Sequence, residues 1–213
     1  MSSPGEPSST SKTADQFPAE LVCDVQTLDG SILHMRPIRP DDGPRLMKFH
    51  EGLSSQSVYR RFFYMHPRLS AAEIERFTHV DYVDRLALVV VDGERLVAVG
   101  RYERLPETSE AEVAFVVADE FQHHGIGTLL LEHLADAAVT RGVVTFVAQT
   151  LTENRDMLDV FIRSGFDVTT SSGHGTVSLR FSMKPDECSQ SSGATRPDYG
   201  THHRRDQGRV QPC

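Results

Sequence analysis

Residues 111–134 constrain the fold of this chain more than any other segment. An apolar run over 111–117 predicts a buried strand, and a helical pattern of apolar residues follows after a short loop. That loop contains Gln122-x-x-Gly125-x-Gly127. Glycines let a ligand approach the backbone, and the first N–H groups of a helix lack partners within the helix, so an anion such as pyrophosphate could bind here. Two glycines before a helix are also often only a tight turn, and the loop alone leaves both interpretations open.

The residues after Gly127 exclude two other nucleotide-binding loops. A dinucleotide-binding loop needs a third glycine at position 130, which is Leu130. A Walker A loop needs Lys and then Ser or Thr after its last glycine, but Thr128 and Leu129 follow here.

The rest of the chain alternates strand and helix patterns. Asp-Gly pairs at 29–30 and 92–93 predict two β-hairpins, and Ser70-x-x-Glu73 predicts the start of a helix. The full pattern predicts strands over 22–28, 32–38, 85–91, 96–102, 111–117, 143–150, 168–170 and 176–181, and helices over 45–51, 58–63, 70–77, 126–140 and 154–163. Early hairpins and later helical connections predict an α/β fold with a mixed central β-sheet and helices on both faces.

The two ends of the chain differ in composition from the middle. The length of 213 residues fits one domain with tails. Residues 1–20 and 184–213 are polar and lack apolar periodicity, so we expect disordered tails around a single domain at 21–183. A cluster from His202 to Arg205 either binds a metal or an anion or is simply part of a solvated tail.

Composition also narrows the cellular setting. No apolar run approaches the roughly 18 residues of a membrane helix, and the N-terminus lacks the apolar core of a secretory signal. Three scattered cysteines fit a reducing cytosol, and a formal net charge of −8 argues against nucleic acid as the main partner. We therefore expect a cytoplasmic protein without membrane or nucleic-acid partners.

The glycine loop and a second segment together resemble the GNAT superfamily of N-acetyltransferases. The family motif Gln/Arg-x-x-Gly-x-Gly/Ala after a central strand is matched by Gln122, Gly125 and Gly127. The segment LTENRDMLDVFIRSGF matches a second motif, in which Asn154 begins a helix. The resemblance covers roughly residues 29–183. Within the superfamily the chain is most similar to the catalytic domain of bacterial Pat-type protein-lysine acetyltransferases, through DGSILHMRPIRPDD, SVYRRFF and AEVAFVV.

Acetyl transfer to an amine requires a proton acceptor, because a lysine amine with a pKa near 10.4 is almost entirely protonated at pH 7. The resemblance implies that Glu112 is this general base, and we expect burial in its apolar strand to raise its pKa. Glu110 is the rival, since it lies two residues earlier and shares a strand face with Glu112. A glutamate at a strand start can also be simply a solvated rim residue.

The resemblance further implies how acetyl-CoA, the co-substrate, would be held. The backbone N–H near Val116 would polarise the thioester carbonyl, and the backbone of Phe115, Val116 and Val117 would pair with the pantetheine arm. Asn154 would lie near the cofactor or would only cap the following helix. The residues implied to hold the pyrophosphate are His123, His124, Gly125, Ile126, Gly127 and Thr128, preceded by Gln122.

The chain departs from the family at one position. Many members carry a tyrosine there that reprotonates the CoA thiolate, whereas this chain has Phe161. His123 and His124 could donate to phosphate or have little effect. No metal is expected, since these two residues and His133 do not form an HExxH pattern. The resemblance implies acetyl transfer from acetyl-CoA in a ternary complex, with a protein lysine as the best acceptor. A small-molecule amine acetyltransferase and a non-catalytic acyl-CoA-sensing module are the alternatives.

Overall fold

The computed structural model describes residues 17–183. The expected tails, apart from residues 17–20, and the His202–Arg205 cluster lie outside the described residues. The elements, with η for 3₁₀-helices, are η1 (Ala19–Leu21), β1 (Cys23–Gln26), β2 (Ile32–Pro37), η2 (Pro40–Asp42), α1 (Gly43–Glu51), α2 (Ser55–Phe62), α3 (Ala71–Thr78), β3 (Arg85–Asp92), β4 (Arg95–Arg104), β5 (Glu110–Val117), η3 (Asp119–Phe121), α4 (Ile126–Thr140), β6 (Thr145–Leu151), α5 (Arg155–Ile162), β7 (Asp167–Gly173) and β8 (Thr176–Ser182).

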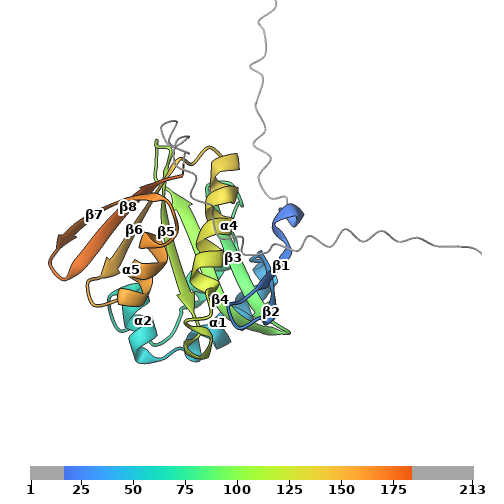
Figure 1. The fold of residues 1–213 in the computed structure, drawn as a ribbon. Helices are drawn as coiled ribbons and strands as arrows, with labels where there is room; N and C mark the ends of the chain where they lie inside the picture. The colour runs from blue at the N-terminus through green and yellow to red at the C-terminus, as the bar shows by residue number, and fades with distance from the viewer. Residues whose placement is uncertain (1–16, 184–213) are drawn as a thin grey trace, which may run out of the picture.

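The strands form one sheet in the order β1-β2-β3-β4-β5-β6-β8-β7 (Figure 1). Every neighbouring pair in this sheet is antiparallel except β5 and β6, which are parallel. Both predicted hairpins are present, and their turn glycines Gly30 and Gly93 have φ of 87° and 55°. Glycine adopts this left-handed conformation without a steric penalty, which explains why the two Asp-Gly pairs locate the turns.

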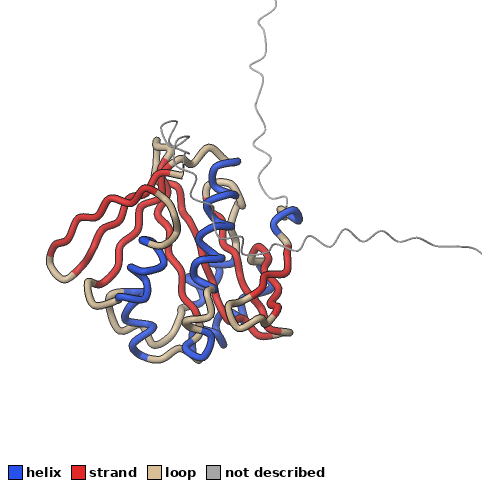
Figure 2. The backbone as a smooth tube through the Cα atoms, in the orientation of Figure 1, coloured by secondary structure: helices blue, strands red, loops and turns tan. Residues whose placement is uncertain are grey.

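Helices cover both faces of the sheet, as the pattern predicted. On one face α4 lies against Gly100 of β4, where an added Cβ would come within 3.1 Å of Leu134. On the same face α5 places Phe161 against Phe115 of β5, with ring centroids 5.5 Å apart. On the other face Arg101 of β4 lies 4.1 Å above the ring of Phe77 in α3. Figure 2 shows the helices on the two sides of the sheet.

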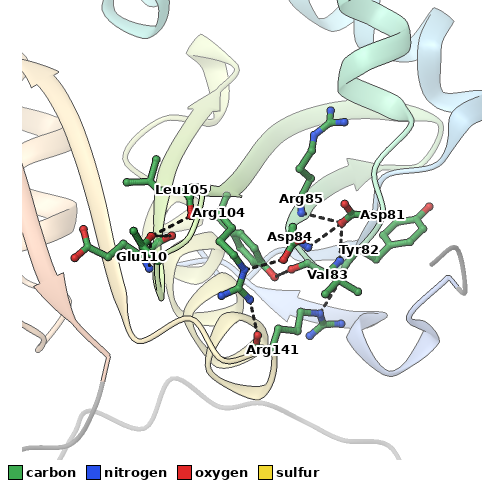
Figure 3. Close-up of polar contacts among 11 residues, drawn as sticks. Asp81, Tyr82, Val83, Asp84, Arg85, Arg104, Leu105, Glu110 and Arg141 are labelled. Carbon is green, nitrogen blue, oxygen red and sulfur yellow. Dashed lines mark hydrogen bonds and ion pairs between the residues drawn. The ribbon is translucent and has the colours of Figure 1, made fainter. Parts of the chain in front are cut away.

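Polar contacts hold the C-terminal end of α4 against the sheet (Figure 3). Arg104 donates from Nε to Asp84 at 2.7 Å and from Nη2 to the carbonyl of Arg141 at 2.5 Å. Arg141 in turn donates to the carbonyl of Tyr82 at 2.7 Å. This network ties the C-cap residue of α4 to β4 and to the loop before β3.

The domain begins earlier than the expected boundary at residue 21. Phe17 packs edge-on against Tyr82, with ring centroids 6.0 Å apart, and the guanidinium of Arg39 lies 4.6 Å from the Phe17 ring centre. Residues 19–21 form η1. Our assignment of residues 17–20 to a disordered tail was therefore wrong, because the lone aromatic residue of that polar segment docks on the domain.

Several strand boundaries also differ from the prediction, among them those of β6 and β7. β6 begins at Thr145 rather than at residue 143, after Gly142 has turned the chain at a φ of 79°. β7 extends over 167–173 rather than 168–170, because its whole Ser/Thr-rich length pairs with β8. Among residues 17–183, no helix has both the length and the apolar character needed to cross a membrane.

Candidate active site

The two central strands separate at Glu112. β5 and β6 pair in parallel only over Glu110–Glu112 and Thr145–Val147. Beyond this point β5 stays with β4, and β6 stays with β8. The strands diverge in Figure 1, and a cleft of about 310 Å³ opens between them. The predicted site residues in its lining are Glu112, Phe115, Val116, Val117, Gln122, His123, Gly125, Ile126, Gly127, Thr128 and Asn154.

Among residues 17–183, no strand pairs with the backbone of β5 on the side that faces the cleft. In an antiparallel pair, successive residues point their N–H and C=O groups alternately toward and away from the partner. Ala118 donates to Val97 of β4, so the register places the backbone groups of Val116 on the β4 side as well. The groups that face the cleft belong to Val113, Phe115 and Val117.

This alternation corrects one expectation from the sequence. The N–H of Val116 itself points toward β4 and cannot polarise a carbonyl in the cleft. The N–H groups of its neighbours Phe115 and Val117 point into the cleft. Periodicity alone could not reveal this, because the face of the backbone depends on which strand β5 pairs with.

The glycine loop begins α4 with a left-handed turn. His123 and Gly125 have φ of 65° and 82°, and Gly125 is the N-cap of α4. No side chain in the described part of the protein caps this helix, so its first N–H groups have no side-chain acceptor there. An added Cβ at Gly125 would lie 3.0 Å from the Cγ of Leu28. The loop is therefore shaped as an anion cradle and held against the β1–β2 turn, whose Leu28 N–H donates to the carbonyl of His124 at 3.0 Å.

Gly127 has a packing role that the motif did not indicate. An added Cβ would lie 3.3 Å from Cγ2 of Val160 on α5, closer than ordinary van der Waals contact. Its absent side chain points toward α5, and this close approach brings the two helices together beside the cleft.

Gln122 and Asn154 stabilise the wall of the cleft through side-chain hydrogen bonds. The side-chain amide of Gln122 donates to Ser57 of α2 and to the carbonyl of Val117, both at 3.1 Å. Asn154 is 4% exposed, accepts from the N–H of Met157 and donates to Thr150. Of our two alternatives for Asn154, the helix cap is present, and the residue also lines the cleft.

The two loop histidines lie in different places. His123 lines the cleft with a side chain that is 71% exposed, and its Nδ1 lies 4.0 Å from a carboxylate oxygen of Asp156. His124 is not among the residues that line the cleft, and its charge acts on Asp29 in the β1–β2 turn. The structure thus assembles ten of the eleven predicted cofactor-binding residues and leaves His124 outside.

Glu112 is exposed, which corrects the expectation that its strand would bury it. The strand is apolar on the face covered by α4 and α5, whereas Glu112 points to the opposite face at the point where the sheet opens. A second hollow, over β6, β8 and β7, also includes Glu112 in its lining, together with Gln149, Ser171 and Arg180. Glu112 is therefore accessible from two directions.

The rival Glu110 is engaged elsewhere. Its carboxylate forms an ion pair with Arg180 of β8, with Nη1 and Oε2 2.7 Å apart. The hydrogen bond from Arg180 holds the pKa of Glu110 below its usual range. A carboxylate with a lowered pKa that is already paired makes a weak proton acceptor.

Phe161, at the position of the family tyrosine, is 2% exposed and packs between Phe115 and Phe181. It lines the cleft as part of an aromatic cluster with these two residues. The departure from the family pattern is therefore consistent with local packing.

Sequence reasoning missed the wall that α2 contributes. Asp119 accepts from the N–H of Ser54 at 2.9 Å and from the hydroxyls of Ser54 and Ser57 at 2.6 and 2.8 Å. Burial raises the pKa of Asp119, but these hydrogen bonds outweigh it and hold the pKa below its usual range. Arg60 and Arg61 of α2 line the cleft. The similarity of SVYRRFF to Pat-type proteins was the one available signal, and it indicated no role for these residues.

Comparisons with known proteins identify the family of this chain. The profile of the acetyltransferase (GNAT) family matches residues 54–166. Acetyltransferase Pat of Mycolicibacterium smegmatis is 34% identical over 144 residues, which are 66% of this chain and 43% of that protein. Acetyltransferase PA5475 of Pseudomonas aeruginosa is 31% identical over 147 residues, covering 67% of this chain and 79% of that protein. The chain thus spans less than half the length of the first relative and about four fifths of the second.

Solved structures show the same fold. The GNAT domain of S. lividans PAT superposes with a TM-score of 0.75 at 40% identity, over 78% of this chain and 99% of that domain. The structure of yncA from Salmonella typhimurium with acetyl-CoA has a TM-score of 0.58 at 15% identity over 76% of this chain and 99% of that one, and shows the fold alone. On the sequence profile, the relatives and the fold together, the chain belongs to the GNAT acetyltransferase family.

Proposed function

We propose that this protein transfers the acetyl group of acetyl-CoA to the amine of a protein lysine, without a metal ion. One observation carries the proposal. The open backbone edge of β5 leads from the uncapped N-terminus of α4 to an accessible carboxylate, Glu112. Those features supply an anion site, a hydrogen-bonding edge and a proton acceptor along one cleft.

The cleft residues suit acetyl-CoA. The first N–H groups of α4, with His123 at the mouth, would hold the pyrophosphate. The backbone of Phe115 and Val117 would pair with the pantetheine arm in the place that a neighbouring strand would take. Their N–H groups would also polarise the thioester carbonyl.

Glu112 would accept the proton of the acceptor ammonium, directly or through water. At pH 7 roughly one lysine amine in 2,500 is free, and deprotonation costs about 4.6 kcal/mol. The free amine then attacks the thioester carbon, the C–S bond breaks, and CoA leaves as a thiolate, which takes up the second proton that the attacking nitrogen loses. No general acid is required, because a thiolate with a pKa near 8.5 is a tolerable leaving group.

The openness of the site favours a protein acceptor over a small amine. Glu112 lies at the junction of the cleft and the second hollow, so a lysine side chain can approach while its backbone stays over β6, β8 and β7. Similarity to the Pat acetyltransferases of M. smegmatis and S. lividans supports acetyl transfer. The resemblance of the sequence to Pat-type protein-lysine acetyltransferases implies the acceptor class.

The test is to incubate the full chain with a whole-cell lysate and isotopically labelled acetyl-CoA, and to follow the label by mass spectrometry. Label on protein lysines supports the proposal, and label on small amines supports the small-molecule alternative. Binding of acetyl-CoA without thiol release would indicate the acyl-CoA-sensing module. A cytoplasmic location stays a prediction, which cell fractionation tests.

A further inference from the structure

Arg61 is a cleft residue without a counter-ion in contact. It lies in the last turn of α2, half-buried, and lines the cleft together with Glu112. Within residues 17–183 it makes no hydrogen bond and no ion pair. Its guanidinium lies 5.1 Å from the centre of the Phe62 ring. Burial lowers the pKa of Arg61, and the carboxylate of Glu112 acts in the opposite direction.

A second guanidinium lies close by. Arg101 projects from β4 opposite Ala114, on the sheet face that carries Glu112. It packs over Phe77 and likewise makes no hydrogen bond or ion pair in the described chain. Burial and the charge of Arg61 lower its pKa to about 9. The two guanidinium groups therefore repel each other.

The charges around this pair do not balance. Arg76 and Arg85 add to the repulsion on Arg101, and Glu103 is the opposing carboxylate. Glu103 already forms an ion pair with Arg76 at 3.0 Å. Arg36 shows the contrast, because both of its terminal nitrogens contact the buried Asp42, at 2.6 and 2.7 Å. A desolvated cation normally has such a partner, and an incoming anion would supply one here.

We propose that Arg61, together with the nearby positive charge of Arg101, forms an anion subsite. This subsite selects acceptors that carry a carboxylate next to the reactive lysine. The inference rests on the proposed function and adds a preference for acidic sequence around the target. The phosphates of CoA are expected at the first turn of α4. Arg61 instead interacts electrostatically with Glu112, at the acceptor end of the cleft.

A guanidinium that acts only through Glu112 would have a different effect. It would change the rate for every acceptor alike, whatever the charge of the neighbouring residue. A subsite changes the KM of acidic acceptors selectively, because only these acceptors lose a contact. A purely structural residue would lower the melting temperature when replaced.

The experiment compares peptides that differ only in the residue after the lysine, which is Glu, Gln or Arg. We expect wild-type protein to prefer the Glu peptide. Arg61→Gln should raise the KM of that peptide about tenfold or more, since a hydrogen bond to a charged group is lost. The KM of acetyl-CoA and the KM of the Gln peptide should change much less than that of the Glu peptide. Any change in kcat caused by the charge lost near Glu112 should be the same for all three peptides. Arg61→Lys should recover part of the preference, and Arg68→Gln, an exposed arginine outside the cleft, is the matched control.

An equal rise in KM for all three peptides, or a raised KM for acetyl-CoA, would overturn the subsite. A melting temperature that is unchanged or higher in Arg61→Gln supports it, and a marked fall indicates a structural role. If no peptide is acetylated, the proposed function fails, and calorimetric titration of the Glu peptide into the CoA-bound protein still tests the subsite. Binding that Arg61→Gln weakens supports it, whereas equal or absent binding refutes it.

Discussion

Replacing Glu112 with Gln tests the chemistry of the site most directly. The change keeps the size and hydrogen-bonding capacity of the side chain and removes its proton affinity. Because Glu112 is exposed, with no hydrogen-bonded partner among the described residues, the change should leave the fold and the affinity for acetyl-CoA intact. Any loss of rate can then be attributed to proton transfer.

The expected loss of rate follows from the free-energy cost of deprotonating the acceptor ammonium ion. Deprotonation at pH 7 costs about 4.6 kcal/mol, from a gap of about 3.4 pKa units. A positioned base typically recovers part of this, so the rate of Glu112→Gln should fall on the order of 10²–10⁴-fold. The residual rate should rise about tenfold per pH unit above neutrality, as the free amine becomes more abundant.

The assay is thiol release from acetyl-CoA at a fixed acceptor concentration, measured between roughly pH 6 and 10. Glu110→Gln is the matched control, because this carboxylate lies two residues away on the same strand face and is paired with Arg180. Glu110→Gln should be nearly silent. Loss of turnover in Glu110→Gln but not in Glu112→Gln would refute our assignment of the base. Silence of both variants would favour the sensing module or proton removal through water.

Three further predictions concern stability and the loop. Asp42→Ala should lower the free energy of unfolding by about 3–5 kcal/mol, because it leaves the buried guanidinium of Arg36 without its ion-pair partner. A change under about 1 kcal/mol in urea unfolding would contradict this. The pKa of Asp119 is lower in the folded protein than in the unfolded chain. Its contribution to stability is therefore present above about pH 4 and is lost as pH falls through the folded pKa. The stability of Asp119→Asn, followed by circular dichroism, should depend less on pH in this range than that of the wild-type protein. Gly125→Ala should weaken CoA binding in calorimetry and cost about 1–2 kcal/mol of stability, whereas Gly93→Ala, also at positive φ but with open space around it, should leave CoA affinity unchanged.

Local chemistry explains why much of the fold could be predicted from the sequence. The Asp-Gly pairs locate two hairpin turns, because only a few residues tolerate their backbone conformation. Ser70 and Glu73 form the predicted capping box of α3. The glycine loop directly precedes α4, and both the strand before it and the helix after it have the expected period. Each of these features depends on residues within a few positions of one another.

The remaining features of the site depend on contacts between distant segments. The cleft exists because β6 leaves β5 after Glu112 and pairs with β8, which begins only at Thr176 and is far from β5 in the sequence. The same pairing leaves Glu112 exposed, although its strand is mostly apolar. Phe17 could be recognised as part of the domain only once Tyr82 was placed beside it.

The sequence by itself determined the order of elements, the position of the glycine loop and the family, since these depend on local periodicity and motif spacing. Only the tertiary structure decided which backbone groups of β5 face the cleft, because that depends on its register with β4. Only the tertiary structure brought Arg61 of α2 and Arg101 of β4 close enough to repel each other. Charge balance in a cleft is a property of neighbours in space, and no pattern along the chain reports it.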